Sequence, residues 1–123
     1  MIVADTSVWV DHLRAGDPAL ASLLDAGRIL GHPWVIAEIA LGSLRNRETV
    51  LSLLDSLPQA PAASVGEIRH MIEERALFSR GIGLMDVGLI ASCLLFPGSS
   101  LWTRDKRLAV VARELGLAFD PAN

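Results

Sequence analysis

The chain has 123 residues, a formal net charge of −3 and 51% hydrophobic residues, with a mean hydropathy of +0.41. This length predicts one domain, 1–123, and the acidic balance excludes the global basic field that nucleic-acid-binding domains often carry. The single cysteine, Cys93, excludes an internal disulfide, and the longest apolar run, 87–96, is too short to cross a bilayer. No basic segment precedes an apolar stretch at the start, so we expect no signal peptide and a cytoplasmic protein.

A short buried strand followed by a carboxylate opens the chain. Residues 2–4, Ile-Val-Ala, form an apolar run without alternation, which is typical of a strand covered on both faces of a parallel sheet. Asp5 follows directly, at the carboxyl end of this strand, where open α/β sheets bind their ligands. Thr6 then begins a helical pattern.

Helices alternate with short strands along the rest of the chain. Caps, apolar spacing and closing glycines or prolines predict helices at 6–14, 18–26, 34–41, 47–57, 85–96 and 105–115. Apolar runs predict further strands at 28–30, 99–103 and 117–119. This alternation predicts an α/β fold with a short central parallel sheet flanked by helices. The helix at 85–96 is apolar on nearly every face and is therefore expected to be central.

One further helix opens with a capping box, Ser64-Val-Gly-Glu67. The apolar positions that keep helical spacing in it are Val65, Ile68, Ile72 and Ala76. The glycines at 81 and 83 end this pattern.

Four acidic residues stand in apolar sequence: Asp5, Glu38, Asp86 and Asp105. Each of the three aspartates lies at or near a predicted helix start, where an aspartate side chain commonly caps the helix. Capping is therefore the simpler interpretation of any one of them alone. Glu38 lies in the middle of a predicted helix and cannot act as a cap.

Together the four acids support a second interpretation, a site for a divalent cation. Strand ends and helix starts collect on one edge of a parallel sheet, so the three aspartates are expected to converge there, with Glu38 reaching in from the side. Ionised carboxylates gathered in an apolar setting repel one another unless a cation compensates them. Oxygen ligands without His or Cys favour Mg²⁺ or Mn²⁺, which activates water against a phosphodiester. The four acids thus predict metal-assisted phosphodiester hydrolysis.

Four segments carry a resemblance, and the Asp-Thr-Ser start and the Thr-Arg-Asp-Lys run are the most specific parts: MIVADTSVW at 1–9, AEIALG at 37–42, DVGLIA at 86–91 and LWTRDKRL at 101–108. In order and spacing they resemble the PIN-domain nucleases and, more narrowly, the VapC-type toxins of toxin–antitoxin pairs. The resemblance implies a single PIN-like domain in which the acidic quartet is catalytic and holds Mg²⁺ or Mn²⁺. It also implies a metal-dependent endoribonuclease that acts on RNA, forms a homodimer and is neutralised by a cognate antitoxin docking near the site.

The same resemblance assigns supporting roles and shows one departure. It implies that Ser7 and Thr103 orient carboxylates or bind water. At 32–34 this chain has His-Pro-Trp where the family often has a small hydroxyl residue. The resemblance therefore does not give the local shape of the chain beside Glu38.

Arg104 and Lys106 flank Asp105 and are the best candidates for contacts with substrate phosphates. Basic residues of this kind are also common on an ordinary solvated face. The three histidines have no ligand spacing with one another, so we interpret them as surface or core residues.

Three rival functions stay open. A receiver-like phospho-acceptor fits the length and the early strand-end acid, but it requires adjacent acids after the first strand, and Thr6 follows Asp5. An idle binding module would keep the fold without the chemistry, although the presence of all four acids argues against it. A DNA nuclease would use the same chemistry, since the preference for RNA rests on the resemblance alone.

Overall fold

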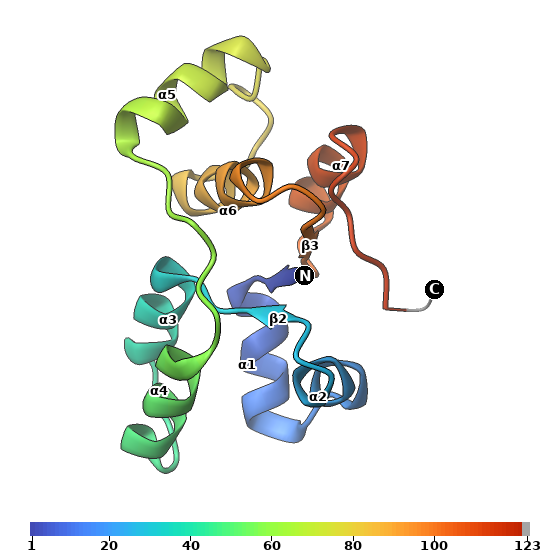
Figure 1. The fold of residues 1–123 in the computed structure, drawn as a ribbon. Coiled ribbons are helices and arrows are strands. Elements are labelled where there is room, and N and C mark those ends of the chain that lie inside the picture. Colours follow the sequence, from blue (N-terminus) through green and yellow to red (C-terminus); the bar gives the residue numbers. More distant parts are fainter. Residues whose placement is uncertain (122–123) are drawn as a thin grey trace.

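The structure of this protein, a computed structural model, describes residues 1–121 (Figure 1). Its strands are β1 (Ile2–Ala4), β2 (Ile29–Leu30) and β3 (Ser100–Trp102). Its helices are α1 (Thr6–Ala15), α2 (Pro18–Asp25), α3 (Pro33–Ala40), α4 (Arg47–Ser56), α5 (Val65–Glu74), α6 (Leu84–Leu95) and α7 (Lys106–Glu114). The strands pair in parallel in the order β2-β1-β3, with Val3 opposite both Leu30 and Leu101. The predicted α/β fold with a short parallel sheet is confirmed.

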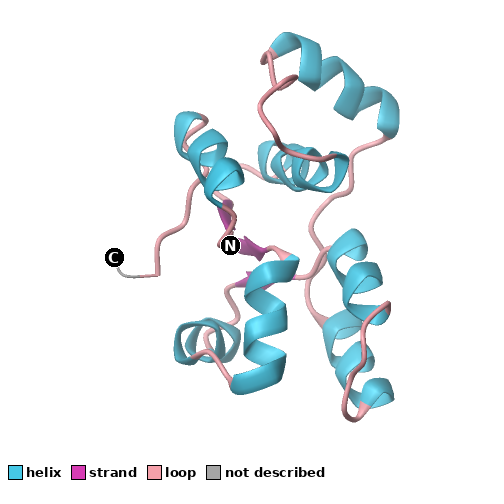
Figure 2. Cartoon of the chain, turned by 180° about the vertical axis from the view of Figure 1, so that it is seen from behind, coloured by secondary structure: helices cyan, strands magenta, loops and turns pink. Residues whose placement is uncertain are grey.

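The sheet lies in the middle of the molecule with helices around it (Figure 2). All three residues of the central strand β1 are buried, in agreement with its apolar run without alternation. In α6, every residue from Val87 to Cys93 is buried, which confirms the prediction of a central helix.

Helix α5 begins as the sequence predicted, and the middle of its predicted apolar stripe, Ile68 and Ile72, packs against the core. The Ser64 hydroxyl accepts the Glu67 N–H at 3.1 Å, and Glu67 accepts the Ser64 N–H at 2.9 Å, so the capping box is complete. Val65 is 67% exposed, whereas Ile68 and Met71 are buried. Ala76 lies beyond the end of the helix with a positive φ of 52°. The expected apolar stripe is therefore wrong at both of its ends.

The predicted strand at 117–119 is also wrong. This segment forms one isolated parallel bridge, between Ala118 and Leu101. The Leu101 N–H donates to the Leu117 carbonyl at 2.7 Å, and the Phe119 N–H donates to the Leu101 carbonyl at 2.9 Å. Pairing stops there because β3 is short and only Leu101 faces this segment.

The carboxyl ends of β1 and β3 lie side by side. The Asp5 N–H donates to the Trp102 carbonyl at 2.9 Å. α1 starts directly after β1, and α7 starts a few residues after β3, so two helix starts meet at this edge of the sheet. Segments from opposite ends of the sequence are thereby brought together. Separately, none of the helices within residues 1–121 is long and apolar enough to cross a membrane.

Candidate active site

Asp5 is the buried centre of the candidate site. It is 6% exposed, because the buried strand β1 delivers it to the carboxyl edge of the sheet. The Ser7 hydroxyl donates to one carboxylate oxygen of Asp5, and the Thr103 hydroxyl donates to the other. The first oxygen also accepts the Val8 N–H at 3.4 Å, as a cap of α1. Donors from two separate segments thus hold both oxygens and orient the carboxylate.

The segment after β3 is tied to Asp5 through the same two hydroxyls. Thr103 Oγ1 accepts the Asp105 N–H at 3.0 Å, and Ser7 Oγ accepts the Arg104 N–H at 3.2 Å. Asp105 itself is exposed and caps α7 by accepting the Leu108 N–H at 2.9 Å. The second acid is therefore placed relative to the first by a short hydrogen-bonded bridge.

Asp86 lies in the first turn of α6 and is partly buried. One of its carboxylate oxygens accepts the Gly83 N–H at 3.0 Å. Burial raises the pKa of Asp86 above its ordinary value, and the negative charges of Asp105, Asp5 and Glu38 raise it further, against the lowering effect of the Gly83 N–H. The mutual repulsion expected among clustered acids therefore acts on Asp86.

The four acids share one hollow of about 190 Å³. Its lining residues are Asp5, Thr6, Ser7, Glu38, Met85, Asp86, Leu89 and Asp105. They come from four separate parts of the chain, and no basic residue is among them. Glu38, in α3, is exposed and does not cap that helix. The structure thus brings together all four residues that the sequence singled out.

The capping interpretation and the shared hollow hold at the same time. Asp5 and Asp105 each cap a helix, and Asp86 accepts the N–H of Gly83, the residue just before α6. Helix starts collect at the edge of the sheet, so residues chosen as caps arrive there together. Among the four acids, only Glu38 lines the hollow without making a capping hydrogen bond.

The donor set of the hollow fits a hydrated divalent cation. Within residues 1–121, no three His, Cys, Asp or Glu side chains lie close enough to hold an ion by themselves. Mg²⁺ commonly takes one or two carboxylates and keeps several waters, so water-bridged acids are compatible with it. The Thr6 hydroxyl oxygen is buried without a hydrogen-bond partner, alone among the described side-chain atoms of this kind, and Thr6 lines the hollow.

Nothing in the sequence marks Thr6 as a site residue. The only signal available was its position between Asp5 and Ser7, and nothing in that position shows that its hydroxyl is buried.

Neither basic candidate lines the hollow. The Arg104 guanidinium pairs with Asp11 at 3.0 Å and with Asp17, and it lies 6.0 Å from the centre of the Trp102 ring. The Leu20 N–H and, to a smaller extent, Arg104 hold the pKa of Asp17 below its ordinary value. Lys106 is exposed at the first position of α7.

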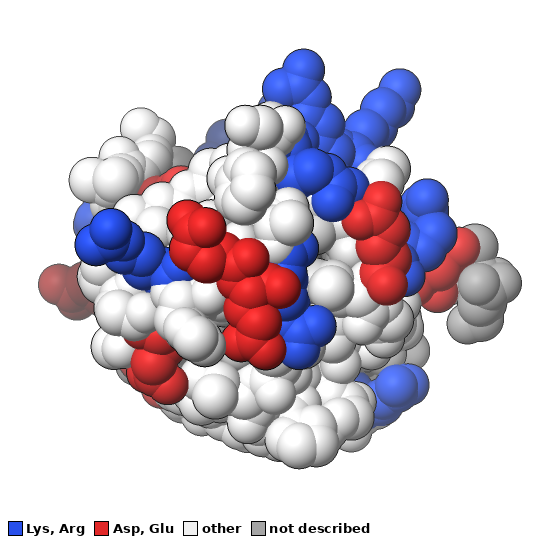
Figure 3. All heavy atoms as spheres, turned by 90° about the horizontal axis from the view of Figure 1, so that it is seen from above, with Lys and Arg blue, Asp and Glu red and all other residues white. Residues whose placement is uncertain are grey.

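Acidic and basic side chains are neighbours over the surface as well. On the face seen from above, a band of Asp and Glu lies beside Lys and Arg side chains (Figure 3). Any nucleic acid approaching this face would meet charges of both signs.

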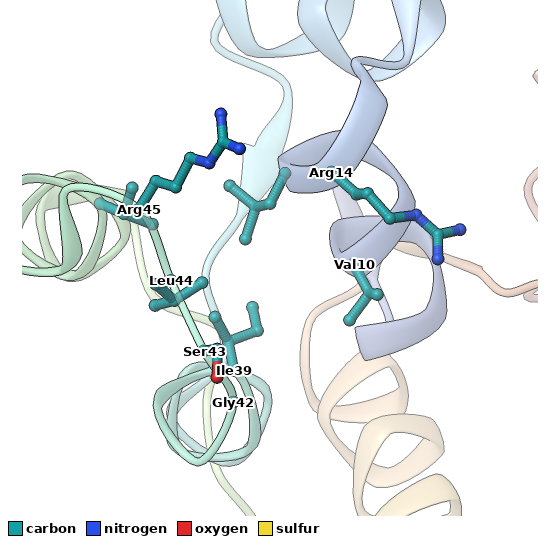
Figure 4. A pocket seen from close by; sticks show the side chains of 9 residues that line it. Val10, Arg14, Ile39, Gly42, Ser43, Leu44 and Arg45 are labelled. Atoms are coloured by element: carbon teal, nitrogen blue, oxygen red, sulfur yellow. The ribbon is translucent and has the colours of Figure 1, made fainter.

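A second, larger hollow lies between α1 and α3 (Figure 4). It measures about 510 Å³. Its apolar lining residues are Val10, Leu13, Ile39, Leu44 and Val50, and Arg14 and Arg45 also border it. Val10 is 46% exposed, so part of this apolar surface faces solvent.

Comparison with known proteins shows the family of the chain. The family model for the PIN domain matches residues 2–114. The chain is 46% identical over 119 residues to Ribonuclease VapC32 of Mycobacterium tuberculosis strain CDC 1551 / Oshkosh and equally to that of strain ATCC 25618 / H37Rv. Each alignment covers 97% of this chain and 96% of the relative. The chain therefore belongs to the PIN-domain family and, within it, to the VapC-type proteins.

Proposed function

We propose that this protein is a divalent-metal-dependent endoribonuclease and the toxin of a toxin–antitoxin pair. The observation that carries the proposal is the single hollow lined by Asp5, Glu38, Asp86 and Asp105 without any basic residue. The relatives named Ribonuclease VapC32, which align over nearly the whole chain, support RNA as the substrate. The chain belongs to the PIN-domain family, and this argues against a receiver-like phospho-acceptor.

In this proposal the three aspartates hold one or more Mg²⁺ or Mn²⁺ ions, directly or through water. Such an ion supplies positive charge to the reacting phosphodiester and lowers the pKa of water. Asp5 is the most strongly oriented acid, since Ser7 and Thr103 donate to its two oxygens. Glu38 is exposed and has no capping bond, so its carboxylate is available to help position both the ion and the attacking water.

Cleavage of RNA by the purified protein tests the proposal. Asp5→Asn and Asp86→Asn should each abolish cleavage while the protein stays folded, because asparagine retains an oxygen that accepts the capping N–H. Asp25→Asn, at an exposed position at the end of α2, is the matched control and should cleave as the wild type does. Full wild-type cleavage in excess EDTA would contradict the metal-dependent mechanism. Equal cleavage of single-stranded DNA would make the protein a less selective nuclease.

The partner in this proposal is a cognate antitoxin that binds near the hollow between α1 and α3. Exposed Val10 and the apolar residues that line the hollow can contact apolar side chains of the antitoxin. Arg14 and Arg45 can pair with its acidic side chains. Val10→Glu should then weaken binding of the protein encoded by an adjacent short reading frame. Val110→Glu, on α7, is a matched control because Val110 is 44% exposed. Equal weakening by both variants would argue against this surface.

We expect the protein to form a homodimer and to act in the cytoplasm, where its RNA substrate and its antitoxin would meet it. Large apolar side chains exposed in and around α5 and α6 support self-association; they are Val65, Phe78, Leu84 and Leu95. Sedimentation equilibrium at micromolar concentration tests the dimer. A monomer under those conditions would refute it.

A further inference from the structure

His32 occupies a position that the proposed chemistry leaves without a role. It lies between β2 and α3 and is 2% exposed. Its Nδ1 accepts the Trp34 N–H at 3.1 Å, so the imidazole is the cap of α3, the helix that contains Glu38. A side-chain acceptor thus stands at the start of α3.

The other ring nitrogen of His32 reaches a different helix. Nε2 lies 2.8 Å from the hydroxyl of Ser92, a fully buried residue of α6. That hydroxyl donates its only proton to the Gly88 carbonyl at 3.1 Å, so Ser92 must accept from His32. Nδ1 accepts and Nε2 donates, which defines one neutral tautomer of the imidazole. Burial also lowers the pKa of His32 to about 4, in keeping with a neutral ring.

Close packing reinforces this link between α3 and α6. The ring of Trp34 lies against Gly88, where an added Cβ would come within 2.3 Å of a ring carbon. The contacts advance in opposite directions along the two helices. His32 faces Ser92, Trp34 faces Gly88, and further along, Glu38 and Asp86 line the same hollow.

The spacing on the two helices is matched. His32 precedes Glu38 by six residues, and Ser92 follows Asp86 by six residues. Six residues span about 9 Å along a helix. A shift of α3 against α6 at the His32–Ser92 contact would therefore also move Glu38, because Glu38 belongs to the helix that His32 caps.

We infer that His32 is a positioning residue: as a neutral imidazole held between Trp34 and Ser92, it sets α3 against α6 and so fixes Glu38 opposite Asp86. This inference rests on the proposed nuclease function. His32 does not touch the hollow, and it acts only through Glu38.

Two variants separate the contacts of His32. His32→Asn keeps an acceptor for the Trp34 N–H and loses the donor to Ser92, whereas Ser92→Ala leaves the cap of α3 intact and removes the acceptor. Each should lower single-turnover RNA cleavage about 10- to 100-fold, the usual effect of losing a contact that orients a site residue. His70→Asn, on the exposed face of α5, is the matched control and should cleave at the wild-type rate.

The background variant Glu38→Gln distinguishes positioning from a general loss of structure. If His32 acts through Glu38, adding His32→Asn or Ser92→Ala to Glu38→Gln causes no further loss of the residual cleavage. A further loss of similar size in that background would overturn the inference. So would wild-type cleavage by both single variants.

Two readouts do not need RNA. Correlation spectra of full-length protein labelled with ¹⁵N-histidine should show one protonated and one unprotonated ring nitrogen for His32, unchanged from pH 8 to pH 5.5. Affinity for Mn²⁺ alone should fall in His32→Asn and in Ser92→Ala. A charged His32, or Mn²⁺ affinities equal to that of the wild type, would overturn the inference. If the wild type cleaves no RNA, the proposed function fails, and these two readouts still decide the role of His32.

Discussion

Thr103 donates a hydrogen bond to the carboxylate of Asp5 across a separation of 98 residues in the sequence. The same hydroxyl oxygen accepts the Asp105 N–H at 3.0 Å. One small side chain therefore joins the end of β1 to the start of α7 and aligns two acids of the hollow. The bond also explains why a hydroxyl residue stands directly after β3.

Replacement of Thr103 tests this connection. Thr103→Val keeps the shape of the side chain and removes the hydroxyl, so both Asp5 and the Asp105 N–H lose a partner. We expect RNA cleavage to fall about 10- to 100-fold and the free energy of unfolding to fall by about 1–3 kcal/mol. Thr103→Ser retains the hydroxyl and should restore most of the cleavage. Equal loss in both variants would show that the methyl group, not the hydrogen bond, is important.

The burial of Asp86, together with the repulsion from the other acids of the hollow, predicts a pH-dependent effect of Asp86→Asn on stability. Folding raises the pKa of Asp86, so the folded chain binds this proton more tightly than the unfolded chain does. The stability from this group is fully present below the ordinary pKa of 3.8 and is lost as the pH rises through the raised pKa. At neutral pH without metal, Asp86→Asn should therefore be as stable as the wild type or more stable. The gain in the free energy of unfolding should be less than about 1 kcal/mol.

Thermal melts in EDTA at neutral pH and below pH 3.8 measure this difference. Any advantage of Asp86→Asn should disappear at the lower pH. A large drop in melting temperature at neutral pH would instead show that the capping bond of the ionised carboxylate is dominant. Its contribution to the stability of α6 would then exceed the free-energy cost of burying the charge near the other acids.

If Arg104 and Lys106 contact RNA phosphates, substitution of each should weaken RNA binding to a different extent. Arg104 already pairs with Asp11 and Asp17, so a phosphate must compete with two carboxylates for it. Lys106→Gln should weaken RNA binding and reduce the salt dependence of log K by about 0.7, the value for one phosphate contact on a single strand. Arg104→Gln should have a smaller effect. Arg69→Gln, at an exposed position on α5, is the control, and titrations at several salt concentrations measure all three.

The approach of Trp34 to Gly88 predicts that a single methyl group is not tolerated at this position. In Gly88→Ala the new Cβ would lie 2.3 Å from the Trp34 ring, so the ring or α6 must move. We expect a loss of about 1–3 kcal/mol in the free energy of unfolding, as for other overpacked cores. Gly66→Ala, in α5, is the matched control, because its nearest contact is at 3.9 Å. That control should be neutral or stabilising by up to about 1 kcal/mol, as urea denaturation would show.

The sequence alone determined the features that depend on near neighbours. An apolar run without alternation identified β1, and a helix apolar on every face identified the buried α6. Capping residues located the starts of α1, α5 and α7 to within a residue. These signals are reliable because the backbone choice at a residue depends mostly on contacts within one turn or one strand.

The tertiary structure decided which distant residues meet. That the segment 117–119 forms only a bridge depends on the length of β3. That Arg104 pairs with Asp11 and Asp17 depends on how α1 and α2 pack beside the segment after β3. The sequence named four acids, but only the packing of α3 against α1 and of α6 against β3 brings Glu38 and Asp86 to the hollow that contains Asp5. Such meetings follow from the shapes of several packed elements at once, which the local pattern of any one segment does not contain.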